Sequence, residues 1–216
     1  MHIVQLVLNH KEVPYTFHDL EPDMGSPKHL ALHPFDRVPI LQHDDFMLYE
    51  TSAIVAYLEE QFPTPSLQPD TAQSRARMNQ WISAVNSYYY PYMIYHVGHE
   101  RNVFPRLGIP SDEKVVAHAL LKIEVGLQVA ERQLSHGQGF LLGGEVTLAD
   151  YYLLPSSYSF GRHRDGQTMY ASFPVVQAWR ERMEKLPAVQ QLREATADLP
   201  PIEHARKWPD THRPKY

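Results

Sequence analysis

The chain has 216 residues, 43% of them hydrophobic, with 20 Lys and Arg against 25 Asp and Glu and no cysteine. This length can form one large domain or two small ones with a real core, and a net charge of -5 gives no support to nucleic-acid binding. The lack of cysteine excludes disulfides, cysteine nucleophiles and thiolate metal sites. Because no long apolar run or basic leader is visible, we expect a cytoplasmic protein without a membrane partner.

The first part of the chain alternates helix and strand signals. Apolar residues between positions 3 and 11 form one broad face of a helix, and residues 13–17 indicate a short strand. Residues 21–27 contain two prolines and a glycine, which favour a loop, and residues 28–32 predict a short helical turn. A small mixed domain therefore begins the chain.

Residues 37–58 are the most informative segment. Residues 38–41 form an apolar strand pattern in which Pro39 is allowed only at an edge, a bulge or the first position. A polar turn follows, residues 46–49 predict the returning strand, and Glu50, Thr51 and Ser52 supply cap residues for a helix. A helix N-terminus can bind a carboxylate, and a strand end beside it can hydrogen-bond a peptide. The segment therefore predicts a site for a small anionic peptide.

A linker and a run of helices follow. Three prolines mark residues 63–70 as the linker between a first domain at 1–62 and an all-α domain at 71–216. The predicted helices cover residues 75–99, kinked at Pro91, then 113–134, a helix opening at Thr147, 173–186 and 188–195. From Leu199 onward we expect an extended tail on the surface.

Three separated motifs are Arg37-Val38-Pro39-Ile40-Leu41, Glu50-Thr51-Ser52-Ala53-Ile54 and Gly143-Gly144-Glu145-Val146-Thr147-Leu148-Ala149-Asp150. They resemble motifs of the cytosolic glutathione transferases. Two further stretches, Leu30-Ala31-Leu32-His33-Pro34-Phe35 and Leu107-Gly108-Ile109-Pro110-Ser111-Asp112-Glu113, resemble most the phi-type or related bacterial branch of that family. The resemblance implies an α+β fold, with a thioredoxin-like N-terminal domain that here lacks its first strand and an all-α C-terminal helical bundle. It also implies a cis proline after Val38 and a capping box between Thr147 and Asp150, which outweighs a catalytic role for that pair.

The resemblance also implies a glutathione site formed by Arg37, Val38, Pro39, Glu50 and Thr51. The backbone of Val38 would pair with the cysteinyl unit, Glu50 would bind the γ-glutamyl ammonium, and Thr51 would bind its carboxylate. Arg37 would face the glycine carboxylate. Thr51 replaces the family's usual serine but keeps the hydroxyl and the N–H.

The sequence leaves the catalytic residue unknown. In the family, a first strand and a loop with Ser, Tyr or Cys precede the helix that matches residues 3–11, and this sequence has no residue at that position. We favour a start codon assigned too far downstream. The alternative is a shortened, non-catalytic protein.

The implied function is conjugation of glutathione to small apolar electrophiles, a detoxification reaction, by a cytoplasmic homodimer with glutathione as cosubstrate and no other cofactor. The alternative is a non-catalytic binding or assembly protein with the same fold. A glutathione-dependent isomerase or reductive dehalogenase is a third possibility.

Two further groups of residues have open or minor roles. The tyrosines between positions 88 and 95, with His96 and His99, could line the electrophile pocket or pack between helices. No histidine pair has a third ligand nearby in the sequence, so no metal site is expected. Arg162, His163 and Arg164 indicate a solvated turn.

Overall fold

A computed structural model describes residues 1–20 and 23–197 and divides into two compact units. The N-terminal unit contains residues 1–67 and returns with residues 186–197, and the helical unit contains residues 68–185. The last described helix thus groups with the N-terminal unit, whereas the domain prediction placed residues 71–216 in the all-α domain. The tail predicted from Leu199 lies outside the described residues.

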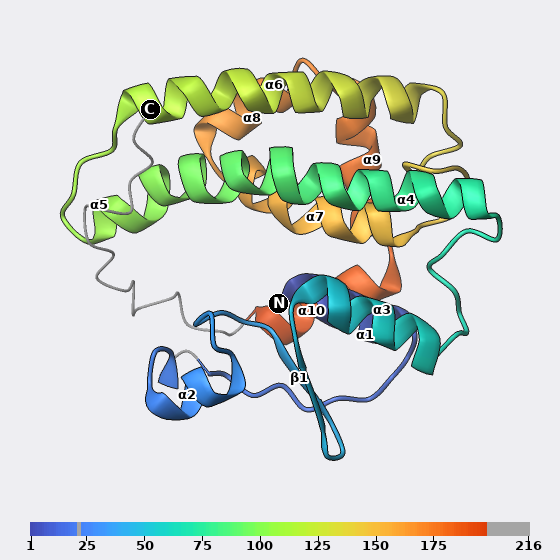
Figure 1. The fold of residues 1–216 in the computed structure, drawn as a ribbon. Coiled ribbons are helices and arrows are strands. Elements are labelled where there is room, and N and C mark those ends of the chain that lie inside the picture. Colours follow the sequence, from blue (N-terminus) through green and yellow to red (C-terminus); the bar gives the residue numbers. More distant parts are fainter. Residues whose placement is uncertain (21–22, 198–216) are drawn as a thin grey trace. The chain divides into compact units, whose positions relative to one another are not determined.

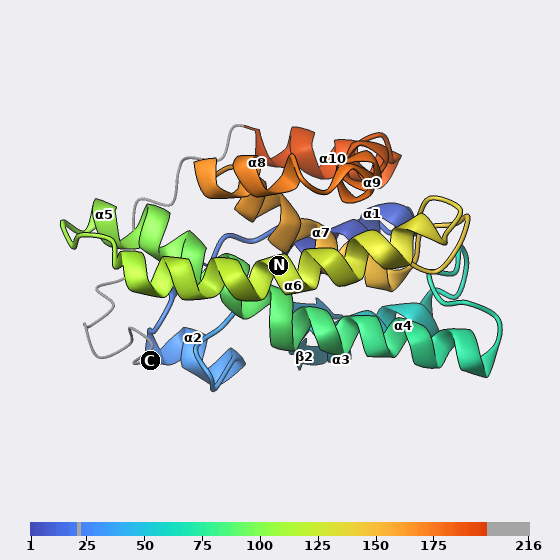
Figure 2. The same cartoon turned by 90° about the horizontal axis from the view of Figure 1, so that it is seen from above.

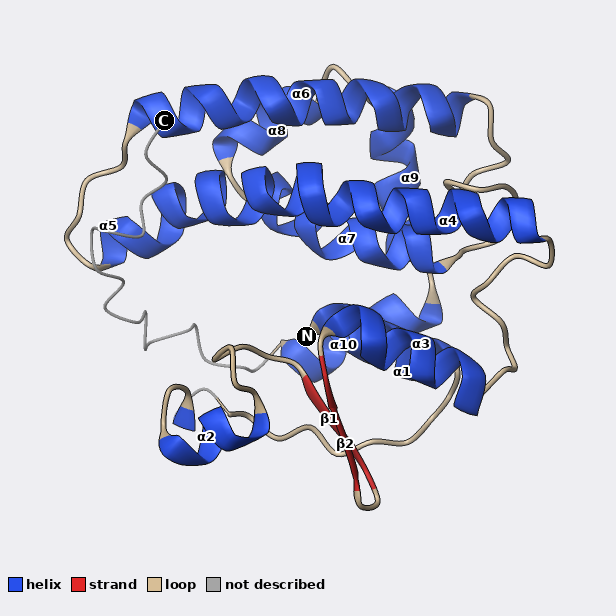
Figure 3. Ribbon diagram, viewed as in Figure 1, coloured by secondary structure: helices blue, strands red, loops and turns tan. Residues whose placement is uncertain are grey.

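The N-terminal unit combines helices with one small sheet (Figure 1). Its elements are α1 (His2–His10), α2 (Pro27–Leu32), β1 (Ile40–His43), β2 (Phe46–Tyr49), α3 (Thr51–Gln61) and α10 (Pro187–Thr196). Strands β1 and β2 pair antiparallel and are the red arrows of Figure 3. The strand predicted at 13–17 is wrong, because a strand needs a ladder partner and β1 and β2 pair only with each other among the described residues.

The core of the N-terminal unit is built where α1 packs against α3 and α10. Leu6 and Ile54 are fully buried there. An ion pair buried in the same region joins Lys11 Nζ to Glu59 at 2.8 Å. Lys11 also donates to the carbonyls of Phe62 and Pro65, at 2.6 and 2.8 Å. The proline-rich segment after α3 is therefore held by α1.

The helical unit consists of helices and connecting loops in its described part (Figures 1 and 3). Its elements are α4 (Ala72–Ala84), η2 (Val85–Tyr89), η3 (Pro91–Val103), α5 (Phe104–Arg106), α6 (Glu113–Ser135), α7 (Leu148–Gly161), α8 (Arg164–Tyr170) and α9 (Pro174–Glu184). Helix α6 packs against η3 and α9, and Figure 2 shows α4 on one side of α6 and α8 and α9 on the other. The α+β fold predicted from the sequence is confirmed. None of the described helices is long and apolar enough to cross a membrane.

The helix predicted at 75–99 is longer than expected and changes type around Pro91. Helical backbone runs from Ala72 to Arg106, with π-helical segments on both sides of Pro91. Proline has no N–H to donate to the preceding turn, so an α-helical bond is lost there and the hydrogen bonding is rearranged. The Tyr90 N–H accordingly donates to the Val85 carbonyl, five residues back.

The tyrosines on this helix differ in their exposure to solvent. Tyr88 is 64% exposed, whereas Tyr89 is buried and donates its hydroxyl to the Gly126 carbonyl at 2.7 Å. A Cβ at position 126 would lie 3.0 Å from the Tyr89 ring, which explains a glycine in the middle of α6. Packing between helices is therefore the role of Tyr89. The rings of Tyr92 and Tyr95 contact His96 and His99 on the same helix.

The N-terminus of α7 is closed by the predicted capping box of Thr147 and Asp150. The buried Asp150 carboxylate accepts four hydrogen bonds, from the Leu141 N–H, the Thr147 N–H and hydroxyl, and Trp179 Nε1. Burial raises the pKa of Asp150, and these four donors oppose the shift. Asp150 thus joins α7, α9 and the loop before α7, which supports a structural role for this acid.

Candidate functional site

The hairpin of β1 and β2 brings the predicted site residues to one place. Ile40 pairs with Tyr49, so the chain enters β1 and leaves β2 at the same end of the hairpin. Arg37, Val38 and Pro39 directly precede this end, and Glu50 and Thr51 directly follow it. Two segments separated by ten residues of hairpin therefore meet at the N-terminus of α3.

The segment before β1 has an open backbone. The Val38–Pro39 peptide bond is cis, as the resemblance implied, and Pro39 precedes the strand rather than lying in it. Val38 is 41% exposed. Neither of its backbone groups has a hydrogen-bond partner among the residues that the structure describes. Both groups can therefore pair with the backbone of a bound peptide.

A buried histidine of α2 holds this segment in place. His29 is 1% exposed, and its Nε2–H donates to the Arg37 carbonyl at 3.0 Å. Its Nδ1 lies 3.1 Å from the Asp36 carboxylate and 3.3 Å from the Gly25 N–H. A neutral ring accepts from Gly25, whereas a protonated ring donates to Asp36. In either form His29 fixes the backbone immediately before Val38.

The N-terminus of α3 is open to a ligand. Its N-cap residue, Glu50, has a φ of 72° and makes no side-chain capping bond. A left-handed φ is costly for a residue with a side chain, and such strain is concentrated at functional sites. The first-turn N–H groups of Thr51, Ser52 and Ala53 have no acceptor within the helix and lie at the positive end of its dipole. This end of α3 is therefore suited to a carboxylate.

Aromatic rings pack beneath the backbone that leads from β2 into α3. The ring of His33, 1% exposed, lies 4.8 Å from the Tyr49 ring and 6.3 Å from the Phe35 ring. Burial lowers the pKa of His33, and the negative charge of Glu50 opposes that shift. The packed rings support the backbone of Tyr49 just before it turns at Glu50.

All five predicted binding residues gather at this end of the hairpin. Arg37 and Glu50 carry exposed side chains, and Pro39 and Thr51 are half-buried. Sequence reasoning missed His29 because a histidine in a short helix gives no local sign of its tertiary partners. Among the described residues, no cluster of three or more His, Asp or Glu side chains could hold a metal ion. The tyrosine and histidine cluster lies in the helical unit.

Two family models match the chain. The model of the glutathione S-transferase N-terminal domain matches residues 3–66, and that of the glutathione S-transferase C-terminal domain matches residues 81–187. The first match contains the whole hairpin and α3. The second contains η3, α6 and α7.

Curated relatives agree with these matches. Glutathione S-transferase F10 of Arabidopsis thaliana is 31% identical over 140 residues, 63% of each protein. The chain therefore spans just under two thirds of that relative. The probable glutathione S-transferase GSTF1 of Oryza sativa subsp. japonica is 30% identical, over 75% of this chain and 74% of its own length. The glutathione S-transferase-like protein LUC7 of a Fusarium species is 32% identical, over 80% and 77%.

Solved structures show the same fold. The structure of glutathione S-transferase III in its apo form aligns with a TM-score of 0.80 and 30% identity, over 93% of both chains. The apo form of human glutathione S-transferase T1-1 aligns with a TM-score of 0.78 and 25% identity, over 96% of this chain and 87% of its own.

Proposed function

Because the chain belongs to the glutathione S-transferase family, we propose that it is a glutathione transferase that joins the glutathione thiolate to a small apolar electrophile. The observation that carries the proposal is the hairpin register, which brings an open Val38 backbone to the uncapped N-terminus of α3. Glutathione has the matching groups, a short peptide backbone with a carboxylate at each end.

Each site residue has a role in this proposal. Both backbone groups of Val38 pair with the cysteinyl unit, and the cis Pro39 follows directly. The first-turn N–H of Thr51 and its hydroxyl bind the γ-glutamyl carboxylate, and the Glu50 carboxylate binds the neighbouring ammonium. Arg37 faces the glycine carboxylate. No bound cofactor is needed, since the thiol of glutathione is itself the nucleophile.

Binding and turnover test different parts of the proposal. We expect calorimetry to detect glutathione binding that Thr51→Val weakens and Thr51→Ser preserves, because serine keeps the hydroxyl and both variants keep the N–H. Glu50→Gln should weaken binding as well, because it removes the charge that pairs with the ammonium. Binding that none of these variants changes would contradict the assigned site.

Turnover is measured with a chloronitroarene, on this chain and on the chain preceded by any in-frame upstream sequence. We expect conjugation by a protein that carries the thiol-activating hydroxyl of the family. Glutathione binding without turnover in either form would favour the non-catalytic alternative. The absence of both glutathione binding and turnover would overturn the proposal.

We also propose that the protein is a cytoplasmic homodimer with a role in detoxification. An apolar stripe on the outer side of α6 supports dimer formation, because Leu121, Val125 and Val129 recur at helical spacing and are 64, 58 and 45% exposed. Sedimentation should give a dimer for the natural chain and a monomer for Val125→Glu. Lys122→Glu, a charge reversal beside the stripe, is the control. A monomeric natural chain would contradict this part.

A further inference from the structure

The helical unit contains an open cavity of about 900 Å³ whose residues have no role in the proposed glutathione site. One wall is α6, through Leu120 and Glu124. The other is α8 with the residues around its start, Arg162, His163 and Arg164. Polar and charged side chains supply much of the lining. This favours a polar ligand over an apolar one.

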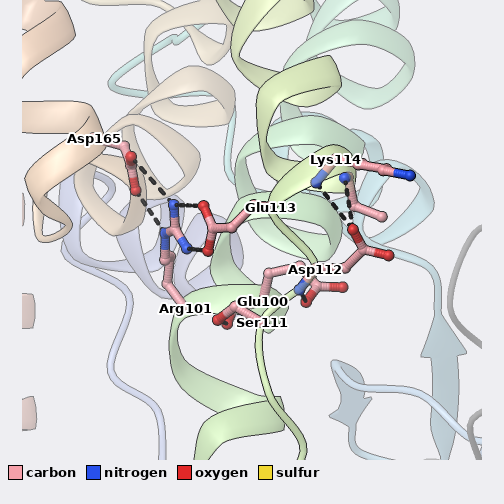
Figure 4. A network of polar contacts seen from close by, with 8 residues as sticks. Glu100, Arg101, Ser111, Asp112, Glu113, Lys114 and Asp165 are labelled. Atoms are coloured by element: carbon pink, nitrogen blue, oxygen red, sulfur yellow. Dashed lines mark hydrogen bonds and ion pairs between the residues drawn. The ribbon is translucent and has the colours of Figure 1, made fainter.

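An ion-pair network holds the two walls together (Figure 4). Arg101 donates from Nε to Asp165 of α8 at 2.7 Å, and from Nη1 and Nη2 to the two carboxylate oxygens of Glu113 of α6 at 2.6 and 3.0 Å. These hydrogen bonds lower the pKa of both carboxyls, so both stay ionised near neutral pH. The charge of Arg101 is therefore already neutralised, and this residue builds the cavity rather than binding a ligand.

Two other guanidinium groups in the lining are available. Arg162 and Arg164 are exposed, and neither side chain has a hydrogen bond or ion pair to any residue that the structure describes. They flank His163 in the sequence and line the same cavity. A pair of guanidinium groups can bind an oxyanion with several parallel hydrogen bonds.

His163 adds a buried donor between the two arginines. The solvated turn expected here is wrong for this residue, which is 8% exposed. It is the N-cap residue of α8, and its ring contacts Asn102 of η3. The Asn102 amide donates to its Nε2 at 3.3 Å, so the neutral ring carries its proton on Nδ1. Burial lowers the pKa of His163, which keeps the ring neutral near pH 7.

We propose that this cavity binds a small hydroxylated molecule that carries a phosphoryl group, such as a sugar phosphate. Two guanidinium charges match a dianion, and the imidazole N–H supplies a further donor to its oxygens. Thr168 and Ser172 line the same cavity, with Glu124, and their hydroxyl and carboxylate groups suit the hydroxyls of such a ligand. The site is independent of glutathione.

Calorimetry at pH 7 with glucose 6-phosphate tests the proposal, with glucose, inorganic phosphate and gluconate as comparison ligands. We expect glucose 6-phosphate to bind more tightly than each of the three. Arg162→Gln with Arg164→Gln should raise its Kd roughly a hundredfold, about tenfold for each charged hydrogen-bonding group removed. No binding, or equal binding of gluconate, would overturn the phosphoryl assignment.

Matched variants locate the site. Arg106→Gln with Arg132→Gln makes the same change of charge at two exposed arginines outside the cavity lining, and it should leave the Kd unchanged. Thr168→Val should weaken glucose 6-phosphate but not inorganic phosphate, because only the sugar needs the hydroxyl. Circular dichroism confirms that each variant is folded. Displacement of glucose 6-phosphate by glutathione would contradict a separate site.

Discussion

Two helix N-termini in this protein have opposite chemistry. At α7, Asp150 is buried and accepts four hydrogen bonds, so the end of the helix is closed by the protein itself. At α3, Glu50 is exposed, has a φ of 72° and makes no capping bond. Both ends begin with first-turn N–H groups that have no acceptor in a regular helical turn.

The difference in capping has a different physical consequence at each end. A closed N-terminus lowers the free energy of the folded state, because the donors that the capping box binds have a partner whether or not a ligand is present. An open one leaves donors for a ligand and carries a backbone strain that the surrounding fold must hold. We therefore expect substitutions at α7 to change stability and substitutions around α3 to change glutathione affinity.

The largest loss of stability is expected at the capped N-terminus of α7. Asp150→Ala leaves the Leu141 N–H, the Thr147 N–H and Trp179 Nε1 without their acceptor in a buried site, which should cost about 4 kcal/mol of unfolding free energy. Urea unfolding measures the loss. Asp112→Ala removes a half-buried N-cap of α6 and should cost only about 1 kcal/mol. Equal losses for the two variants would show that Asp150 acts as a cap alone.

The next largest effect is expected at His29, which holds the segment beside the open N-terminus of α3. His29→Ala removes the donor to the Arg37 carbonyl and frees the segment before Val38. We expect the Kd for glutathione to rise about tenfold, with a loss of about 2 kcal/mol of stability from the buried cavity and the broken hydrogen bonds. Calorimetry on folded protein measures the affinity. Lys28→Ala, on the exposed side of α2, is the control and should change neither the Kd nor the stability. An unchanged Kd for His29→Ala would mean that His29 does not position the site.

A smaller effect with opposite signs is expected at Glu50. Glu50→Gly should raise stability by about 1 kcal/mol, because glycine adopts a positive φ without a steric cost. The same change should weaken glutathione binding, since the carboxylate for the ammonium is lost. Asp44→Gly, at a φ of 53° in the hairpin turn, should raise stability alike and leave binding unchanged. Tighter binding by Glu50→Gly would contradict the role of its carboxylate.

The smallest expected effect is a pH dependence of stability that arises from His33, which is buried beside the open N-terminus of α3. Burial lowers the pKa of His33 below its ordinary value of 6.5, so the unfolded chain takes up this proton first as the pH falls. The contribution of His33 to stability is full above about pH 6.5 and declines below it. Thermal unfolding between pH 5 and pH 8 should show a flatter acid slope for His33→Asn. An unchanged slope would place the acid sensitivity elsewhere.

Local patterns predicted most of the elements. The capping box at Thr147, the hairpin turn and the apolar faces of α1 and α6 act within a few residues, so a single sequence shows them. The strand expected at 13–17 failed because pairing depends on a partner, not on the residues of the strand. The π-helical turns around Pro91 show that a proline predicts a disruption but not its form.

The sequence by itself indicated the five residues proposed to bind glutathione, because they lie in two motifs that resemble those of the family. Only the tertiary structure decided that the hairpin brings these motifs to one end and that His29 holds the segment before Val38. It also decided that His163 is buried, and that Arg162 and Arg164 beside it form no hydrogen bond or ion pair with the residues that the structure describes. The physical reason is distance along the chain. Caps and periodic faces depend on residues that are close in the sequence. The burial of a histidine and the pairing of a guanidinium depend on residues that are distant in the sequence and that only the fold brings near.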